Sequence, residues 1–311
     1  MRYSVDGPLV LKGVDFSLAA GQSCGICGRT GAGKSSLILA LLRMTDLAAG
    51  EIRLDGVNIA QVRRGYLRAR LGMIPQDAFL FSGSLRSNLD VCGRGYSDAA
   101  IWEALRMVQL EEQIRGLEGG LEAEVQERGA NFSQGAVQLL CLARVLLKRP
   151  RLLIMDEATA SVDYKTDHLI QETIRVAFAG CTIICIAHRL QTVIDFDRIC
   201  VMEAGHVVQF GLPADLLAQE TSPFAKLVAH TGQKSAAELR RRAYRKALEA
   251  TPGVAGEEEA QLPVLPPPTV LGKSGGTNDG IGCSTQVAGG LLRVLGGLSG
   301  GSCDCAPPAT A

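Results

Sequence analysis

Gly28-Arg29-Thr30-Gly31-Ala32-Gly33-Lys34-Ser35 fits the pattern G-x-x-x-x-G-K-[ST], between an apolar run at Ser23–Cys27 and a helical pattern that starts at Lys34. Glycines at these positions let the backbone turn so that N–H groups point at phosphate oxygens, and the start of a helix attracts anions. Lys34 is predicted to reach the β- and γ-phosphates, and the Ser35 hydroxyl to hold Mg²⁺. The stretch therefore predicts a nucleotide-phosphate site between a buried strand and a helix.

A second apolar run, Leu152–Met155, ends in the acidic pair Asp156-Glu157. Ligands of open α/β sheets bind where the carboxyl ends of the strands meet, so this pair is predicted to emerge beside the glycine loop. Asp156 suits a contact to Mg²⁺, and Glu157 suits general-base work on an attacking water, which contributes about 10²–10⁴ in rate. An acidic pair after a strand can instead cap a helix, but the intact glycine loop favours the catalytic interpretation.

Before residue 231 the short apolar runs alternate with helical patterns, which predicts an α/β fold. The runs Leu152–Met155 and Cys181–Ile186 are continuously apolar, as central strands of a parallel sheet are. Lys and Arg together number 32, the same as Asp and Glu, so overall charge does not suggest a nucleic-acid partner. No apolar run approaches the ~20 residues of a membrane-spanning helix. We read the cysteines, such as those of Cys24-Gly25-Ile26-Cys27, as small core residues in a reducing compartment.

The sequence changes character after residue 231. Residues 231–249 are basic, with Arg240-Arg241-Arg242 and Arg245-Lys246, and are predicted to form a helical extension. This helix could touch anionic lipid or simply lead, solvated, into the tail. Residues 250–311 are rich in proline and glycine and are predicted to be disordered and dispensable for nucleotide binding, because such a composition cannot offset chain entropy by burial.

Four stretches together resemble the nucleotide-binding domain of ABC transporters over roughly residues 3–230: GRTGAGKSSL (28–37), IPQDAFLFSGSLRSNLD (74–90), LLIMDEATASVD (152–163) and IAHRL (186–190). The resemblance is greatest to the C-terminal ATPase domain of the C subfamily, the multidrug-resistance-protein type. It implies a P-loop NTPase fold with a mixed β-sheet core, an antiparallel β-subdomain and an α-helical signature subdomain at about 84–148, all within an ATP-binding domain at residues 1–230.

By this resemblance Tyr3 stacks on adenine, Gln76 contacts Mg²⁺ and water and senses the transmembrane partner, and Asp163 acts across a dimer. His188 matches the histidine that contacts the γ-phosphate. The implied catalytic residues are Glu157, His188 and Gln76, and the implied Mg²⁺ ligands are Ser35, Gln76 and Asp156. The implied nucleotide-binding set is Tyr3, Gly28, Arg29, Thr30, Gly31, Ala32, Gly33, Lys34, Ser35, Ser36, Ser133, Gly135 and Asp163.

Two features depart from the family pattern. The signature, commonly LSGGQ or LSVGQ, is here Phe132-Ser133-Gln134-Gly135-Ala136, so Ser133 and Gly135 remain while the glutamine is replaced by Ala136. We therefore expect a weakened signature and a heterologous second nucleotide-binding domain. Met1 stands almost at the adenine-stacking aromatic, where the family has another strand and, further upstream, transmembrane helices. We expect the chain to be the C-terminal piece of a longer transporter or the translation of an incompletely assigned gene.

The leading prediction is an ATP-hydrolysing domain that powers export of a solute across a membrane. Its expected cofactors are ATP and Mg²⁺, and its expected partners are transmembrane domains and a second nucleotide-binding domain, with no nucleic acid. It is expected on the cytoplasmic side, contacting the membrane through its partner only. Segment Phe79–Leu89 resembles the surface that docks a transporter's coupling helix. The alternative is a soluble or channel-regulating ABC ATPase outside any transporter. A nucleotide kinase lacks support, since no acceptor-site lid is evident.

Overall fold

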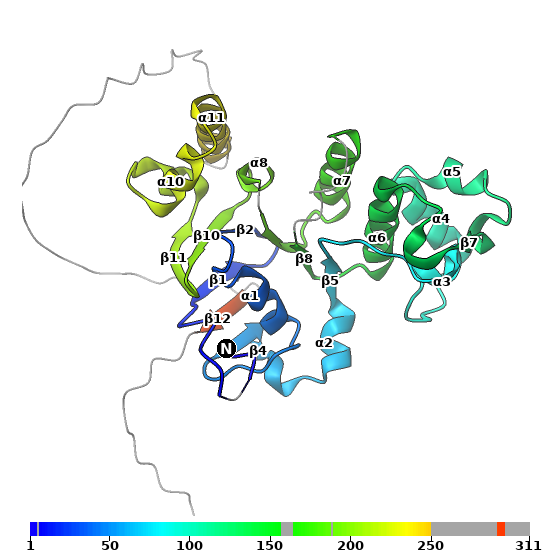
Figure 1. Ribbon diagram of the computed structural model, residues 1–311, viewed down its shortest axis with the longest axis horizontal. Coiled ribbons are helices and arrows are strands. Elements are labelled where there is room, and N and C mark those ends of the chain that lie inside the picture. The colour runs from blue at the N-terminus through cyan, green and yellow to red at the C-terminus, as the bar shows by residue number, and fades with distance from the viewer. Residues whose placement is uncertain (5, 157–163, 188, 250–290, 296–311) are drawn as a thin grey trace, which may run out of the picture.

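A six-stranded sheet forms the centre of the computed structural model, which describes residues 1–4, 6–156, 164–187, 189–249 and 291–295 (Figure 1). Its strands follow the order β11 (His206–Gly211), β10 (Arg198–Glu203), β2 (Ser23–Cys27), β9 (Thr182–Ile186), β8 (Leu152–Asp156) and β5 (Leu71–Ile74). From β10 to β5 all neighbours pair in parallel, and β11 alone is antiparallel. The predicted α/β fold with a mixed sheet is confirmed.

A second sheet is antiparallel and has the order β1 (Phe16–Ala19), β12 (Leu291–Leu295), β3 (Glu51–Leu54) and β4 (Val57–Asn58). Asp55 and Gly56 join β3 to β4 and both have positive φ, 49° and 77°, as a tight hairpin turn requires. The buried faces of β1 and β3 pack in one cluster with α1 (Lys34–Leu41), so this sheet supports the first helix of the domain.

β12 corrects one prediction. Residues 250–311 were expected to be disordered, yet Leu291–Leu295 pairs with β1 on one side and β3 on the other. The segment Leu-Leu-Arg-Val-Leu is apolar at four of its five positions, and pairing on both edges satisfies backbone N–H and C=O groups. The average composition of the tail conceals this short apolar segment. The rest of residues 250–311 lies outside the described residues.

A helical part is inserted between β5 and β8 and lies at the right of Figure 1. It comprises α3 (Leu85–Leu89), α4 (Asp98–Met107), α5 (Glu111–Arg115), α6 (Gln134–Lys148) and a small sheet of β6 (Gly83–Ser84) and β7 (Glu124–Val125). The apolar faces of these helices form one core with those of α7 (Tyr164–Ala177) and the neighbouring strands. Serine hydroxyls accept from backbone N–H groups at the starts of α3, α4 and α6, which fixes where these helices begin.

The remaining helices are α2 (Arg64–Arg70), α8 (Leu190–Val193), α9 (Pro213–Ala218), α10 (Pro223–Ala229) and α11 (Gln233–Glu249), with short 3₁₀ turns at Ile59–Gln61, Gly120–Glu122 and Glu127–Gly129. α11 is the basic segment. Its Leu239 and Ala243 are buried, and its Lys246 donates to Asp197 at 2.9 Å, so part of its charge is used in docking to the domain. Among the described helices, none is both long and apolar enough to cross a membrane.

The cysteines in the described part of the chain are free, and Cys24, Cys27, Cys185 and Cys200 are buried in the sheets. Burial raises the pKa of the Cys27 thiol to about 12 and keeps it protonated. The described residues contain no group of three or more His, Cys, Asp or Glu side chains that could hold a metal ion. Cys24 and Cys27 are both buried, which agrees with their prediction as small core residues.

Candidate nucleotide-binding site

The glycine loop joins the carboxyl end of β2 to the start of α1. Gly28, Gly31 and Gly33 have φ of 151°, 81° and 101°, conformations that residues with a Cβ rarely adopt. A Cβ at Gly28 would lie 2.3 Å from the carbonyl oxygen of Met202 at β10, so this glycine also allows a close approach of backbone to backbone. The loop is thus held in one shape by its own φ angles and by the neighbouring strand.

Lys34 folds back over this loop. Its ammonium donates to the carbonyl oxygens of Gly28 at 2.8 Å and of Arg29 at 3.1 Å, and the residue is only 6% exposed. The N-cap residue of α1 is Gly33, which has no side chain to cap the first N–H groups of the helix. A positive charge and uncapped helix N–H groups therefore meet at the loop, which is the arrangement that binds phosphate.

Tyr3 lies against the same turn of α1. Its hydroxyl is hydrogen-bonded to the Ser36 Oγ at 2.7 Å, while the residue remains 59% exposed. The segment that carries Tyr3 is fixed to the domain by a bond from the Val10 N–H to the carbonyl oxygen of Met1, at 3.0 Å. An exposed ring held beside the glycine loop can stack on a nucleobase. Ser36 thus holds Tyr3, while the Ser35 side chain is exposed at the loop.

Asp156 is the last residue of β8 and is half-buried. Strand β9 lies between β8 and β2, and Asp156 is opposite Ile186 in the register. Two strand spacings, about 10 Å, therefore separate the strand that carries Asp156 from the one that carries the loop. Burial, then the neighbouring Cys27 and Asp156, raise the pKa of the Cys185 thiol on β9.

Gln76 follows β5, the strand that pairs with β8, and its side chain is exposed. Gln76, Asp156 and the glycine loop therefore all leave the same edge of the sheet, and for Asp156 and the loop this was predicted from the carboxyl ends of parallel strands. Glu157, Asp163 and His188 lie outside the described residues.

The signature residues lie elsewhere in the single chain. Ser133 caps α6, its hydroxyl accepting from the Ala136 N–H at 3.2 Å, and it is exposed. A Cβ at Gly135 would lie 3.1 Å from the Thr166 hydroxyl oxygen on α7, so a small residue suits this position. α6 belongs to the helical part at the right of Figure 1, whereas α1 lies with the sheets at the lower left. The structure does not bring Ser133 or Gly135 to the glycine loop of the same chain. Ala136 itself is buried.

The β10–β11 turn is a support that sequence reasoning missed. The Gly205 N–H donates to the carbonyl oxygen of Ala32 at 3.0 Å, and the Gly205 carbonyl accepts from the Lys12 N–H at 2.8 Å. Gly205 has φ of 88°, and a Cβ there would lie 2.0 Å from the Val10 carbonyl oxygen. Ala204-Gly205 between two apolar runs is a turn signal, but only the fold shows that the turn supports the loop.

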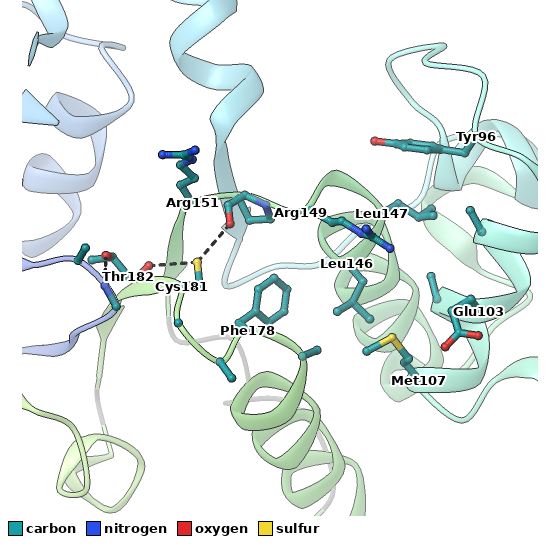
Figure 2. A pocket seen from close by; sticks show the side chains of 18 of the residues that line it. Tyr96, Glu103, Met107, Leu146, Leu147, Arg149, Arg151, Phe178, Cys181 and Thr182 are labelled. Carbon is teal, nitrogen blue, oxygen red and sulfur yellow. Dashed lines mark hydrogen bonds between the residues drawn. The ribbon is translucent and has the colours of Figure 1, made fainter. Parts of the chain in front are cut away.

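A cavity of about 860 Å³ lies away from this edge, where α4 and α6 approach the end of α7 (Figure 2). Its lining includes Leu146, Leu147, Met107 and Phe178, and no predicted site residue. Cys181 in its wall donates to the carbonyl oxygens of Pro150 and Thr182, at 3.3 and 3.5 Å. Burial raises the pKa of this thiol to about 11, so it is protonated near pH 7. No residue of the Gly28–Ser35 loop lines this cavity.

Comparison with known proteins adds to this geometry. Residues 11–160 match the family model described as "ABC transporter". The chain is 48% identical over 235 residues to "ABC transporter C family member 3" of Arabidopsis thaliana, an alignment that covers 76% of this chain and 16% of that protein. It is likewise 48% identical over 222 residues to "ATP-binding cassette sub-family C member 2" of Rattus norvegicus, covering 71% and 14%.

Among solved structures, the chain is similar to the one titled "Structure of a bacterial Atm1-family ABC exporter with ATP bound". The TM-score is 0.70 and the sequence identity 36%, over 75% of this chain and 40% of that one. The chain spans about one sixth of the length of the curated relatives that it matches.

Proposed function

Because the chain belongs to the ABC transporter family as an ATPase domain of the C-family type, we propose that it binds MgATP at the Gly28–Ser35 loop and that hydrolysis there powers the export of a solute. The observation that carries the proposal is the preformed loop. The Lys34 ammonium is hydrogen-bonded to the loop, the uncapped start of α1 follows it, and the exposed Tyr3 ring is bonded to the first turn of that helix.

The residues at this edge have the chemistry that Mg²⁺ requires. Ser35 offers a hydroxyl, Asp156 a carboxylate and Gln76 an amide, and hard cations prefer such oxygen ligands. When bound, Mg²⁺ neutralises charge on the phosphates. In this proposal Lys34 holds the β- and γ-phosphates, Glu157 accepts the proton of the attacking water, and His188 contacts the γ-phosphate. Asp163 acts at the interface with a second domain.

An exposed aromatic pair supports coupling to a transmembrane partner. Phe79 and Phe81 are 45% and 51% exposed, and their rings make an edge-on contact with centroids 5.1 Å apart. Between them Leu80 is buried and anchors the segment. Two neighbouring aromatic rings on the surface, fixed at their base, suit an apolar partner segment. We therefore favour the transporter over the soluble or channel-regulating ATPase.

Arg144 and Asn88 hold the backbone of the aromatic pair, Phe79 and Phe81, in place. The Arg144 guanidinium donates to the carbonyl oxygens of Phe79 at 2.8 Å and Asn88 at 2.6 Å, and to the Asn88 Oδ1 at 2.7 Å. Asn88 in turn accepts from the Phe81 N–H at 2.8 Å and donates to the Phe81 carbonyl at 2.7 Å. The bonds from Arg144 are charge-assisted, and together with those of Asn88 they fix the backbone of Phe79 and Phe81 to the helical part.

A second nucleotide-binding domain is part of the proposal. Ser133 and Gly135 are in the helical part, so a signature from another domain would have to face this loop. Because Ala136 replaces the family's glutamine, we propose that this second domain is a different chain or domain with an intact signature. The assembly would lie on the cytoplasmic face of a membrane, and this chain would touch the membrane through its partner. The transported solute is chosen by that partner.

The transport part is tested by Phe81→Asp, which adds a charge to the aromatic pair. The matched control is Tyr66→Asp, since Tyr66 is an equally exposed aromatic on α2. Co-expressed with the transmembrane domains of a C-family transporter, the chain should lose recovery in the membrane fraction on Phe81→Asp but not on Tyr66→Asp. Both variants should keep MgATP binding. Equal recovery of all three proteins would favour the ATPase that is not part of a transporter.

A further inference from the structure

The cavity of about 860 Å³ opens at the amino ends of β8 and β9 (Figure 2). Its lining includes Thr182, the first residue of β9, and Arg151, which directly precedes β8. The glycine loop follows the carboxyl end of β2, a strand that is parallel to β9. The cavity and the nucleotide site therefore lie at opposite ends of these strands. Small-molecule sites have volumes of about 300–1,000 Å³, so the cavity is large enough to hold a ligand.

Apolar side chains from both parts of the fold line the cavity. Met107 comes from α4, Leu146 and Leu147 from the last turn of α6, and Phe178 directly follows α7. In Figure 2 the Phe178 ring and the side chains of Leu146 and Met107 are directed toward one common space. A thioether, an aliphatic side chain and an aromatic ring together suit the face of an aromatic ligand.

Arg149 adds a positive charge to this apolar lining. Figure 2 shows its side chain extending to the side of the cavity where Leu147 lies. The residue is exposed, and no hydrogen bond or ion pair engages its guanidinium among the residues that the structure describes. The guanidinium is therefore available to an anion that enters the cavity.

The carboxylates in the lining have other arginines as partners. Glu103 is paired with Arg106, one turn further along α4. Asp55 lies 3.9 Å from the Arg151 guanidinium. Neither carboxylate neutralises Arg149, so a ligand with a negative group complements the charge that these pairs leave over.

The backbone at Arg149 adds an independent observation. Arg149 is the C-cap of α6, with φ of 47° and ψ of 61°, and its N–H donates to the carbonyl oxygens of Val145 and Leu146 at 3.2 Å. Glycine is the usual residue for a left-handed helix end, because a Cβ strains this conformation. The backbone therefore does not account for an arginine at this position, whereas a role of the side chain in the cavity does.

We propose that this cavity is a second ligand site, separate from the nucleotide site, and that its ligand is an organic anion with an aromatic body. The apolar lining holds the aromatic body, and the Arg149 guanidinium donates charge-assisted hydrogen bonds to a carboxylate or sulfonate. The ligand contacts the last turn of α6 and the segment after α7 at once, so it holds these two helices together. α6 begins after Ser133, so the site acts on the far end of the helix that carries the signature segment.

Fluorescence titration of the full chain with 8-anilino-1-naphthalenesulfonate tests the ligand class. N-phenyl-1-naphthylamine is the matched neutral probe, since it has the same rings without the sulfonate. Arg149→Gln removes the charge from the cavity. Arg128→Gln is the matched control, because Arg128 is also exposed and has φ of 58° but does not line the cavity.

The sulfonate probe should bind the wild type and Arg128→Gln equally, and Arg149→Gln roughly three- to tenfold more weakly. The neutral probe should bind all three proteins alike. Equal affinity of the sulfonate probe for Arg149→Gln and the wild type, or no binding to the wild type, would overturn the proposal. An equal loss of both probes in Arg149→Gln would overturn the assignment of an anion.

Hydrogen exchange of the full chain locates the bound sulfonate probe. In the wild type, the probe should slow exchange in peptides containing Val145–Arg149 and Phe178–Thr182. Peptides containing Gly28–Ser35 and Phe79–Leu89 should be unchanged, which excludes the nucleotide site and the aromatic pair as the place of binding. Slower exchange at either of those segments, with none at the cavity, would overturn the proposal.

Discussion

The Tyr3 hydroxyl and the Ser36 hydroxyl are hydrogen-bonded at 2.7 Å, so the aromatic ring nearest the start of the chain is held at the first turn of the phosphate-binding helix. The ring itself is exposed, and only its hydroxyl is engaged in this bond. Recognition of a base would therefore depend on the face of the Tyr3 ring. The position of that ring would depend on its hydrogen bond to Ser36.

Tyr3→Ala and Tyr3→Phe separate these two roles. Stacking of a base on an aromatic ring is worth about 1–3 kcal/mol, so Tyr3→Ala should weaken ATP binding roughly tenfold. Tyr3→Phe keeps the ring and loses only the bond to Ser36, so its affinity should stay within about threefold of the wild type. Isothermal titration with ATP gives both values. An equal loss in the two variants would mean that the hydroxyl, not the ring, matters.

Gly28→Ala and Gly31→Ala differ in the space they meet. Both positions have positive φ, but a Cβ at Gly28 would meet the Met202 carbonyl at 2.3 Å, whereas one at Gly31 would meet nothing within 4 Å. Gly31→Ala should cost about 1–2 kcal/mol from backbone strain. Gly28→Ala should cost more and should lower the unfolding midpoint further, as measured by calorimetry. Equal stability of the Gly28→Ala and Gly31→Ala variants would show that β10 can move away from the added Cβ at little cost in free energy.

Asp197 links β2 to α11 and makes stability depend on pH. Burial disfavours its charged form, but hydrogen bonds from the Ser23 N–H, the Lys246 ammonium and the Ser23 hydroxyl outweigh burial and lower the pKa of Asp197. A lowered folded-state pKa contributes stability above the unfolded value of about 3.9 and loses it as the pH falls through the folded pKa.

Asp197→Asn should therefore lower the free energy of unfolding at pH 7 by roughly 1–2 kcal/mol. The difference from the wild type should begin to shrink as the pH falls below about 4, where Asp197 of the unfolded chain takes up a proton, and should be lost as the pH falls through the lower pKa of the folded state. Urea unfolding between pH 3 and pH 7 measures it. A difference that stays constant, or grows, toward acid pH would contradict this assignment.

Glu157→Gln keeps the size of the side chain and removes the proton acceptor. If Glu157 is the general base, ATP should bind with nearly unchanged affinity while turnover falls by about 10²–10⁴. Phosphate release in the presence of the partner domain is the measurement. Undiminished phosphate release would show that a group other than Glu157 accepts the proton of the attacking water.

The fold and the phosphate loop could be predicted because their signals are local. The glycine loop Gly28–Ser35 stands between a strand and a helix, and β8 and β9 are continuous apolar runs. Each of these features can be recognised from consecutive residues. The support from Gly205 could not be predicted in this way, because it depends on β10 lying beside β2. β12 was missed because a five-residue strand is masked by the composition around it, and its partners β1 and β3 lie far away in sequence. Asp156 was predicted to emerge at the edge of the sheet that carries the glycine loop and lies there, since parallel strands end together. Gln76 was assigned a role only by the family resemblance, and the structure places it at the same edge, after β5.

The central claim is that Lys34 binds the phosphates of MgATP in the Gly28–Ser35 loop. Its ammonium donates to the Gly28 and Arg29 carbonyls, which keeps it at the loop. Loss of charge-assisted hydrogen bonds costs about 1.5–3 kcal/mol, so Lys34→Ala should weaken binding roughly 10- to 100-fold in a titration with fluorescent MgATP. Unfolding midpoints of both proteins, measured alongside, verify that Lys34→Ala is folded. Equal affinity of folded Lys34→Ala and the wild type would contradict the account.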